Sequence, residues 1–100
     1  MKETEVIVKT DAVRVRIMTL GQREIADWHY HAAVTDDIFC LTGIIIVRMK
    51  DPREEHMLEP GERCQIKTGI THQLENFGDE EATYLLVQGI GEYDFNIVEN

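Results

Sequence analysis

Asp27-Trp28-His29-Tyr30-His31 is the stretch of sequence that decides the fold. It lies within residues 25–31, where aromatic and β-branched residues favour an extended backbone. Side chains alternate between the two faces of a strand, so His29 and His31 are predicted to point the same way and Tyr30 the opposite way. Two imidazoles on one face, about two strand rises apart, can converge on one metal ion.

The length and composition indicate a single globular domain covering residues 1–100. A hydrophobic fraction of 43% is ordinary for a packed core, and no apolar run approaches the roughly 18 residues that span a membrane. The polar start, Met1–Glu5, does not resemble a signal peptide, so a cytoplasmic location is expected. Cys40 and Cys64 are then expected to be reduced.

The formal net charge of −9 bears on the class of partner. Nucleic acid and anionic membranes bind to a positive field, so neither is expected here, and a small molecule is the expected ligand or substrate. Acidic residues cluster at residues 51–59 and 79–81, and both clusters are interpreted as solvated loops.

Short strands separated by turn residues account for most of the chain. No segment keeps a period of 3.6 residues over three turns, and this pattern predicts an all-β sandwich or barrel with almost no helix. A charged loop is predicted at residues 50–55. Strands are predicted at residues 6–9, 13–18, 25–31, 36–41, 44–49, 63–67, 72–75, 82–88 and 93–98.

The predicted strand at residues 44–49 is apolar on both of its faces along Ile44–Val47. Both faces should therefore be covered, and in so small a protein the second cover is expected to come from another subunit. The sequence thus predicts a homodimer.

Histidines and glycines recur at fixed spacings between Gly21 and Asn76. His29-x-His31 is followed by four residues, Asp36, six residues and Gly43. Later, Gly61 is followed by five residues and then by Lys67-x-Gly69-x2-His72-x3-Asn76. These spacings resemble the two motifs of the cupin superfamily, G-x5-H-x-H-x3,4-E-x6-G and G-x5-P-x-G-x2-H-x3-N.

The cupin resemblance implies a double-stranded β-helix, or jelly-roll barrel, with a metal site inside it. It implies that His29, His31 and His72 bind a divalent transition metal, with Asp36 as the fourth ligand. Three imidazoles and a carboxylate suit Fe, Mn, Ni, Co, Cu or Zn, and the residues do not choose among them.

The sequence departs from the family pattern at three points. Seven residues rather than five separate Gly21 from His29, which changes only a loop length. Lys67 replaces a proline, although Gly69 can still supply the turn. Asp36 replaces glutamate and is one methylene shorter, so it can bind the metal directly, bind it through water, or orient a histidine.

Several other polar residues have weaker predicted roles. Asp37 should face away from Asp36, and His56 is interpreted as a solvated surface histidine. Cys40 shares a face with Asp36, so it should line the barrel either as a small core residue or as a thiol near the metal. Gln65 or Gln88 can supply a polar group inside the barrel. Trp28 and Tyr30 should pack away from the histidines.

The resemblance implies a metal-dependent enzyme of the dioxygenase, isomerase or lyase class that acts on a small oxygenated metabolite. No residue stands out as a dedicated general base, so the sequence does not select a reaction. The alternative is a non-catalytic module that binds a small, sugar-like ligand, and a structural or storage dimer is a third possibility. A shared fold does not decide between these functions.

Overall fold

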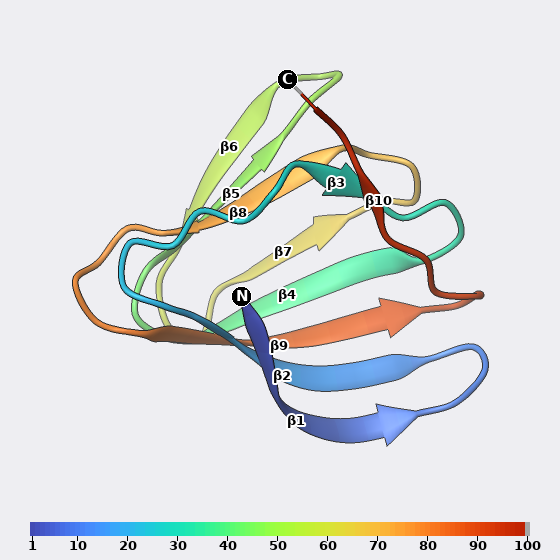
Figure 1. Ribbon diagram of the computed structural model, residues 1–100, viewed down its shortest axis with the longest axis horizontal. Coiled ribbons are helices and arrows are strands. Elements are labelled where there is room, and N and C mark those ends of the chain that lie inside the picture. The colour runs from blue at the N-terminus through green and yellow to red at the C-terminus, as the bar shows by residue number, and fades with distance from the viewer. Residues whose placement is uncertain (100) are drawn as a thin grey trace.

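The computed structural model describes residues 1–99 as two five-stranded antiparallel sheets that face each other (Figure 1). One sheet has the strand order β1-β2-β9-β4-β7, and the other has the order β10-β3-β8-β5-β6. The strands are β1 (Lys2–Lys9), β2 (Arg14–Leu20), β3 (His29–Tyr30), β4 (Thr35–Thr42), β5 (Ile45–Met49), β6 (Glu54–Leu58), β7 (Arg63–Ile66), β8 (His72–Asn76), β9 (Ala82–Gly89) and β10 (Asn96–Ile97). This confirms the predicted all-β double-stranded β-helix, and no helix occurs among residues 1–99.

The hydrophobic core lies between the two sheets because residues of alternating burial line both inner faces. Strand β9 alternates buried and half-buried residues along its whole length, as a strand with one covered face should. The largest fully buried apolar side chains are those of Leu20, Ile38, Ile45, Val47, Ile66 and Tyr84.

The apolar strip on strand β5 is buried within one chain, so the expectation that a second subunit covers it was wrong. Ile45 and Val47 face the core, while Ile46 on the opposite face is only 3% exposed. Ile46 is flanked in register by Met57 of β6 and Glu75 of β8, and neighbouring strands in a sheet place such side chains on the same face.

Three predicted segments differ from the structure. The strand expected at residues 25–31 is reduced to β3, although Ile25 makes an isolated bridge to Glu75. The last strand, expected at residues 93–98, is only β10. Residues 54–58 of the expected acidic loop form strand β6, because backbone pairing with β5 holds them although four of the five side chains are exposed. The second acidic cluster, residues 79–81, is an exposed turn as predicted.

Two motif glycines have clear physical reasons. A Cβ on Gly43 would lie 2.8 Å from the Cβ of Ala82, so only glycine permits this close approach. Gly69 has a φ of +81°, which disfavours other residues, and its N–H donates to the carbonyl oxygen of His31 at 2.8 Å. Gly69 therefore ties the turn before His72 to the segment that carries the other two histidines.

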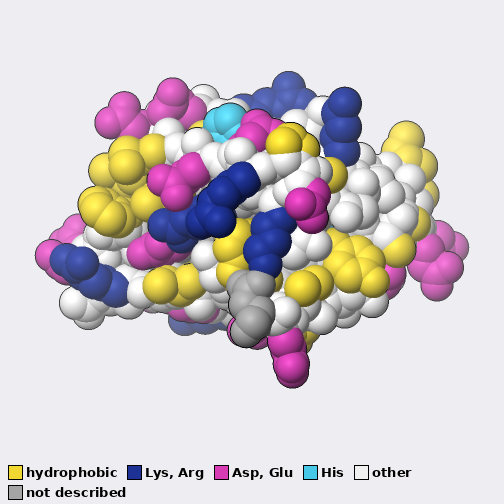
Figure 2. Space-filling model, turned by 90° about the horizontal axis from the view of Figure 1, so that it is seen from above, with side chains coloured by type: hydrophobic (Ala, Val, Ile, Leu, Met, Phe, Trp, Pro, Cys, Tyr) yellow, Lys and Arg dark blue, Asp and Glu magenta, His cyan; other side chains and the backbone are white. Residues whose placement is uncertain are grey.

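The surface is mixed in character. Figure 2 shows acidic, basic and hydrophobic side chains intermingled on the face seen from above. Residues 1–99 contain no helix that is long and apolar enough to cross a bilayer.

Candidate metal centre

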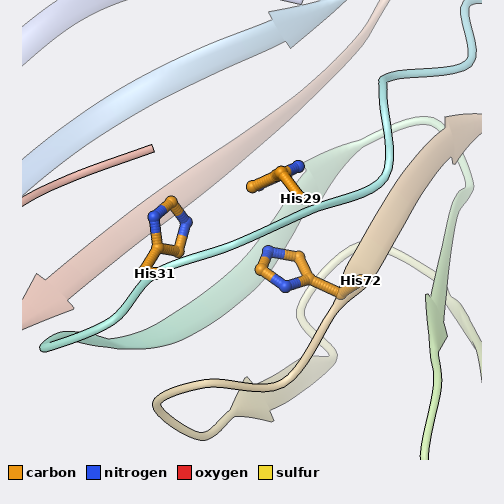
Figure 3. Close-up of side chains that lie close together, drawn as sticks. All are labelled: His29, His31 and His72. Carbon is orange, nitrogen blue, oxygen red and sulfur yellow. The ribbon is translucent and has the colours of Figure 1, made fainter. Parts of the chain in front are cut away.

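Three histidine side chains meet between the sheets, as the sequence predicted. His29 in β3 pairs in register with His72 in β8, and His31 comes directly after β3, two residues beyond His29 (Figure 3). The side chains of His29 and His31 are 4% exposed, and that of His72 is 1% exposed. One ring nitrogen from each of the three lies within 4.8 Å of the others, a spacing at which a single ion could be held.

Each ring is oriented by a hydrogen bond from its Nδ1 atom. His29 Nδ1 donates to the Asp27 carbonyl oxygen at 2.9 Å, His31 Nδ1 to that of Asp94 at 2.6 Å, and His72 Nδ1 to that of Ile70 at 2.8 Å. A carbonyl oxygen only accepts hydrogen bonds, so each Nδ1 carries a proton. In the neutral ring, Nε2 then keeps the lone pair that a metal would use, and such outer contacts are typical of metal-binding histidines.

Asp36 of β4 faces the same space from the opposite sheet. Its Oδ2 lies 3.2 Å from His31 Nε2 and 3.4 Å from His72 Nε2. Ligands about 2.1 Å from an ion in adjacent octahedral positions are about 3 Å apart, so these two distances suit a shared ion. Its other oxygen, Oδ1, accepts a hydrogen bond of 3.0 Å from Gln88 Nε2.

Burial and mutual contact shift the pKa values in this cluster. Burial, followed by the neighbouring His72, lowers the pKa of His29 to about 4, so this ring is neutral at pH 7. Burial alone would lower the pKa of His31, but the Asp36 carboxylate raises it above its ordinary value. Burial alone would raise the pKa of Asp36, but contacts with His31 and His72 hold it well below its usual range, so Asp36 is a carboxylate.

One observation that does not depend on the spacing of the ligands also supports a divalent metal. His72 Nε2 is buried and makes no hydrogen bond to any part of the chain that the structure describes. It faces Asp36 at 3.4 Å, but not in hydrogen-bonding geometry. A buried polar atom without a partner is costly, and a metal at this point would give it one.

The histidines open onto a cavity of about 80 Å³. Apolar side chains and the polar groups of Arg16, Tyr84 and Gln88 line it together with the histidines and Asp36. The segment before β10 closes one side, where the Phe95 ring stacks on that of His29 with centroids 4.3 Å apart.

The sequence analysis missed Arg16, Tyr93, Asp94 and Phe95 as site residues. Arg16 shares a strand face with Met18 and Leu20, whose apolar side chains were the available signal that this face is buried. Residues 93–95 were expected to form a regular strand, and nothing local indicated that they would bend over the histidines.

The structure also resolves the weaker predictions about glutamine and aspartate. Gln88 is buried and bonds to Asp36, whereas Gln65 is exposed. Asp37 faces outward as predicted, where its Oδ1 accepts hydrogen bonds from Arg63 and Gln65.

Cys40 is a core residue rather than a thiol beside the histidines. Its Sγ lies 3.4 Å from the carbonyl oxygen of Gly43, and Cys40 is not among the residues that line the cavity. Both cysteines are free, as predicted. His56 is exposed and lies beside Glu54, and the ring of Trp28 contacts the Lys50 ammonium instead of the histidine cluster.

The profile of the cupin domain family matches residues 16–88, which is most of the chain. The chain belongs to the cupin family. This confirms the resemblance inferred from the two spaced motifs. No curated protein matches the chain in sequence.

Solved structures resemble this cupin in fold at low sequence identity. An uncharacterized conserved protein with a double-stranded β-helix domain from Klebsiella pneumoniae is 20% identical, with a TM-score of 0.81 over 95% of this chain and 82% of that chain. The capsular polysaccharide assembling protein CapF from Staphylococcus aureus is 20% identical, with a TM-score of 0.82 over 95% of this chain and 29% of that one. Oxalate oxidase is 17% identical, with a TM-score of 0.80 over 87% of this chain. This cupin spans 46% of the oxalate oxidase chain, and at this low identity the similarity concerns the fold alone.

Proposed function

We propose that this cupin binds one divalent transition metal through Nε2 of His29, His31 and His72, with Asp36 as the fourth ligand. The observation that carries the proposal is the common orientation of the three rings. Each Nδ1 proton is committed to a backbone carbonyl oxygen, so three Nε2 atoms are left for one shared space. The ion is Fe, Mn, Ni, Co, Cu or Zn, all of which accept imidazole and carboxylate ligands.

The proposed activity is that of a metal-dependent enzyme, of the dioxygenase, isomerase or lyase class, acting on a small oxygenated metabolite. A bound divalent ion would supply Lewis-acid polarisation of substrate oxygens. The chain itself contributes a small cavity beside the histidines and an aromatic ring, Phe95, that stacks on His29 at the edge of the cavity. Among the structural neighbours, oxalate oxidase is named for a small oxygenated substrate, which supports this class of ligand.

The alternative is a non-catalytic module that binds a small, sugar-like ligand. Among the side chains of the described residues that line the cavity, the Asp36 carboxylate and the three imidazoles are those that could accept a proton near pH 7, and all four are assigned to the metal. Burial also raises the pKa of Tyr84, which keeps its hydroxyl protonated. That no other side chain of the described cavity lining could act as a general base favours this alternative.

A metal titration followed by a turnover assay tests the proposal. Cobalt(II) added to metal-free protein should saturate at one ion per chain, with a visible absorption spectrum that reports nitrogen and oxygen ligands. If the protein binds no cobalt, or if cobalt binding persists when the three histidines are substituted, the proposed site is contradicted. With the metal in place, consumption of a bound small molecule would support an enzyme, and reversible binding without turnover would support the alternative.

We also propose a homodimer, with strand β1 rather than β5 as the contact. Strand β1 ends its sheet, and Val6, Ile7 and Val8 are 46%, 49% and 43% exposed. Antiparallel pairing of two copies about Ile7 would place Val6 opposite Val8 and Glu5 opposite Lys9, which matches apolar and oppositely charged side chains.

Light scattering tests the dimer, for which the expected mass is twice 11.5 kDa. Replacing Ile7 with glutamate should yield the monomer. The same change at Ile25, which is also exposed but lies outside β1, should leave the dimer intact. A wild-type protein of monomer mass would contradict the proposal.

The cytoplasmic location stays a prediction.

A further inference from the structure

A buried arginine lies in the histidine-lined cavity of a strongly acidic chain. Arg16 points inward from β2 and is 7% exposed. It lines the same cavity as His29, His31, Asp36 and His72. An arginine keeps its charge at any physiological pH, and a buried charge requires a partner of opposite sign. The partners of Arg16 therefore indicate what the cavity is built to hold.

Arg16 is only partly satisfied by the protein. Its Nη2 donates to Gln88 Oε1 at 2.6 Å, and its Nη1 donates to Glu3 Oε1 at 3.2 Å. Its Nε is buried and has no hydrogen-bond partner within residues 1–99. Glu3 is a largely solvated partner whose side chain is 42% exposed, so it compensates the charge of Arg16 weakly.

Gln88 separates Arg16 from the nearest buried carboxylate. Its Oε1 accepts from Arg16 and its Nε2 donates to Asp36 Oδ1, so the amide is held in one orientation. Asp36 in turn contacts His31 and His72, and its charge is directed toward the proposed metal. On the same strand face as Arg16, Arg14 adds a second guanidinium, which lies 3.9 Å from the centre of the Tyr93 ring.

Tyr84 adds a neutral donor to the cavity. Its buried hydroxyl donates to the sulfur of Met1 at 3.0 Å, and a thioether is a weak acceptor. A carboxylate oxygen accepts a hydrogen bond far better than sulfur does, so an anionic ligand could take the place of the Met1 side chain at this hydroxyl.

We propose that the cavity binds a short-chain carboxylate, whose charge is recognised by Arg16 and Tyr84 while its oxygens face the metal site. This inference rests on the proposed metal site and names the substrate class for it. A cavity of about 80 Å³ has the volume of two or three waters at about 30 Å³ each, which suits an acid of two or three carbons. Neutral sugars would leave the charge of Arg16 compensated only by the largely solvated carboxylate of Glu3.

Calorimetric titration of glycolate into cobalt-loaded protein tests the inference, with glycolamide as a neutral ligand of the same size. The cobalt content is measured first, so that failure of the metal site is seen separately. Glycolate should bind and alter the visible cobalt spectrum, and glycolamide should bind at least about tenfold more weakly, because it lacks the charge that strengthens the hydrogen bonds from Arg16 and Tyr84. Equal binding of the two ligands, or no glycolate binding at millimolar concentration by cobalt-loaded protein, would overturn the inference.

Variants of two arginines localise the effect. R16Q that carries one cobalt ion per chain should bind glycolate about ten- to hundredfold more weakly than the wild type, and R16K should be intermediate because it keeps the charge but loses the planar donor set. R63Q is the matched control, since Arg63 is paired with Asp37 on the outer surface. A folded R16Q that binds glycolate as tightly as R63Q does would overturn the assignment. If R16Q does not fold, R16K decides in its place, and R16K that binds glycolate as tightly as R63Q does would equally overturn it.

Discussion

Asp36 and Asp37 are neighbours in strand β4, yet they lie in opposite environments. Asp36 points between the sheets, where it is 3% exposed and contacts His31, His72 and Gln88. Asp37 points outward and pairs with Arg63 near solvent. The same type of side chain is thus a candidate metal ligand on one face of the strand and part of a surface ion pair on the other. The direction of the side chain, and not the residue type, decides the chemistry.

The largest effect is expected at the histidine that the chain leaves without a partner. H72A should weaken metal binding by more than the roughly 10–100-fold cost of losing an outer contact, because it removes a direct ligand. H56A is the control, since His56 lies on the surface beside Glu54, and it should bind metal normally. Competition with a chelator of known affinity measures both, and equal affinities would contradict the assignment.

The two aspartates give the next largest difference. D36N keeps the shape of the side chain but removes its charge, and we expect it to weaken metal binding on the order of 100-fold. D37N should not change the affinity, because Asp37 faces away from the histidines. A loss below about tenfold for D36N would favour a three-histidine site that Asp36 only orients.

The buried face should also shape the pH dependence of stability in metal-free protein. Because folding lowers the pKa of His29 to about 4, its stabilising contribution is lost as the pH falls from about 6.5 toward 4. His31 acts in the opposite direction, because folding raises its pKa and its contribution is lost as the pH rises through the raised value.

Urea unfolding at several pH values measures this contrast. Metal-free H29Q should lose less stability than the wild type between pH 6.5 and 4, and metal-free H31Q should lose more. Parallel curves for all three proteins would show that these rings do not contribute as described.

The smallest effect is expected when the ion pair on the outer face is removed and the free energy of unfolding is measured. D37N removes a surface ion pair with Arg63 and should lower the free energy of unfolding by less than about 1 kcal/mol. Urea unfolding of the metal-free protein at pH 7 checks this value. A loss as large as that of a core substitution would show that Asp37 is more tightly constrained than its position indicates.

The sequence predicted those parts of the site that follow from local alternation or from family spacing. Parity alone put His29 with His31 and separated Asp36 from Asp37, and His72 was placed by the second motif. Arg16 was missed because its face of β2 begins with two arginines and ends with Met18 and Leu20. Only the packing of the sheets shows that this face points inward. Phe95 was missed for a similar reason, since its contact with His29 joins distant segments.

The strands, too, were predicted where a local hydrophobic pattern marks them and missed where it does not. Strands β8 and β9 alternate clearly and were predicted nearly to their ends. Strand β6 was missed because its side chains are charged or exposed and its backbone pairing with β5 leaves no hydrophobic pattern. The dimer contact on β5 was predicted from apolarity alone, without the flanking strands that cover it.

The metal content of natively purified protein tests the central claim most directly. Elemental analysis and anomalous diffraction from the same batch should show one divalent transition metal per chain, with its density in contact with Nε2 of His29, His31 and His72. The same protein carrying H72A should lose the metal on dialysis against a chelator. Full metal occupancy in H72A after that dialysis, or a metal found elsewhere in the wild type, would contradict the account.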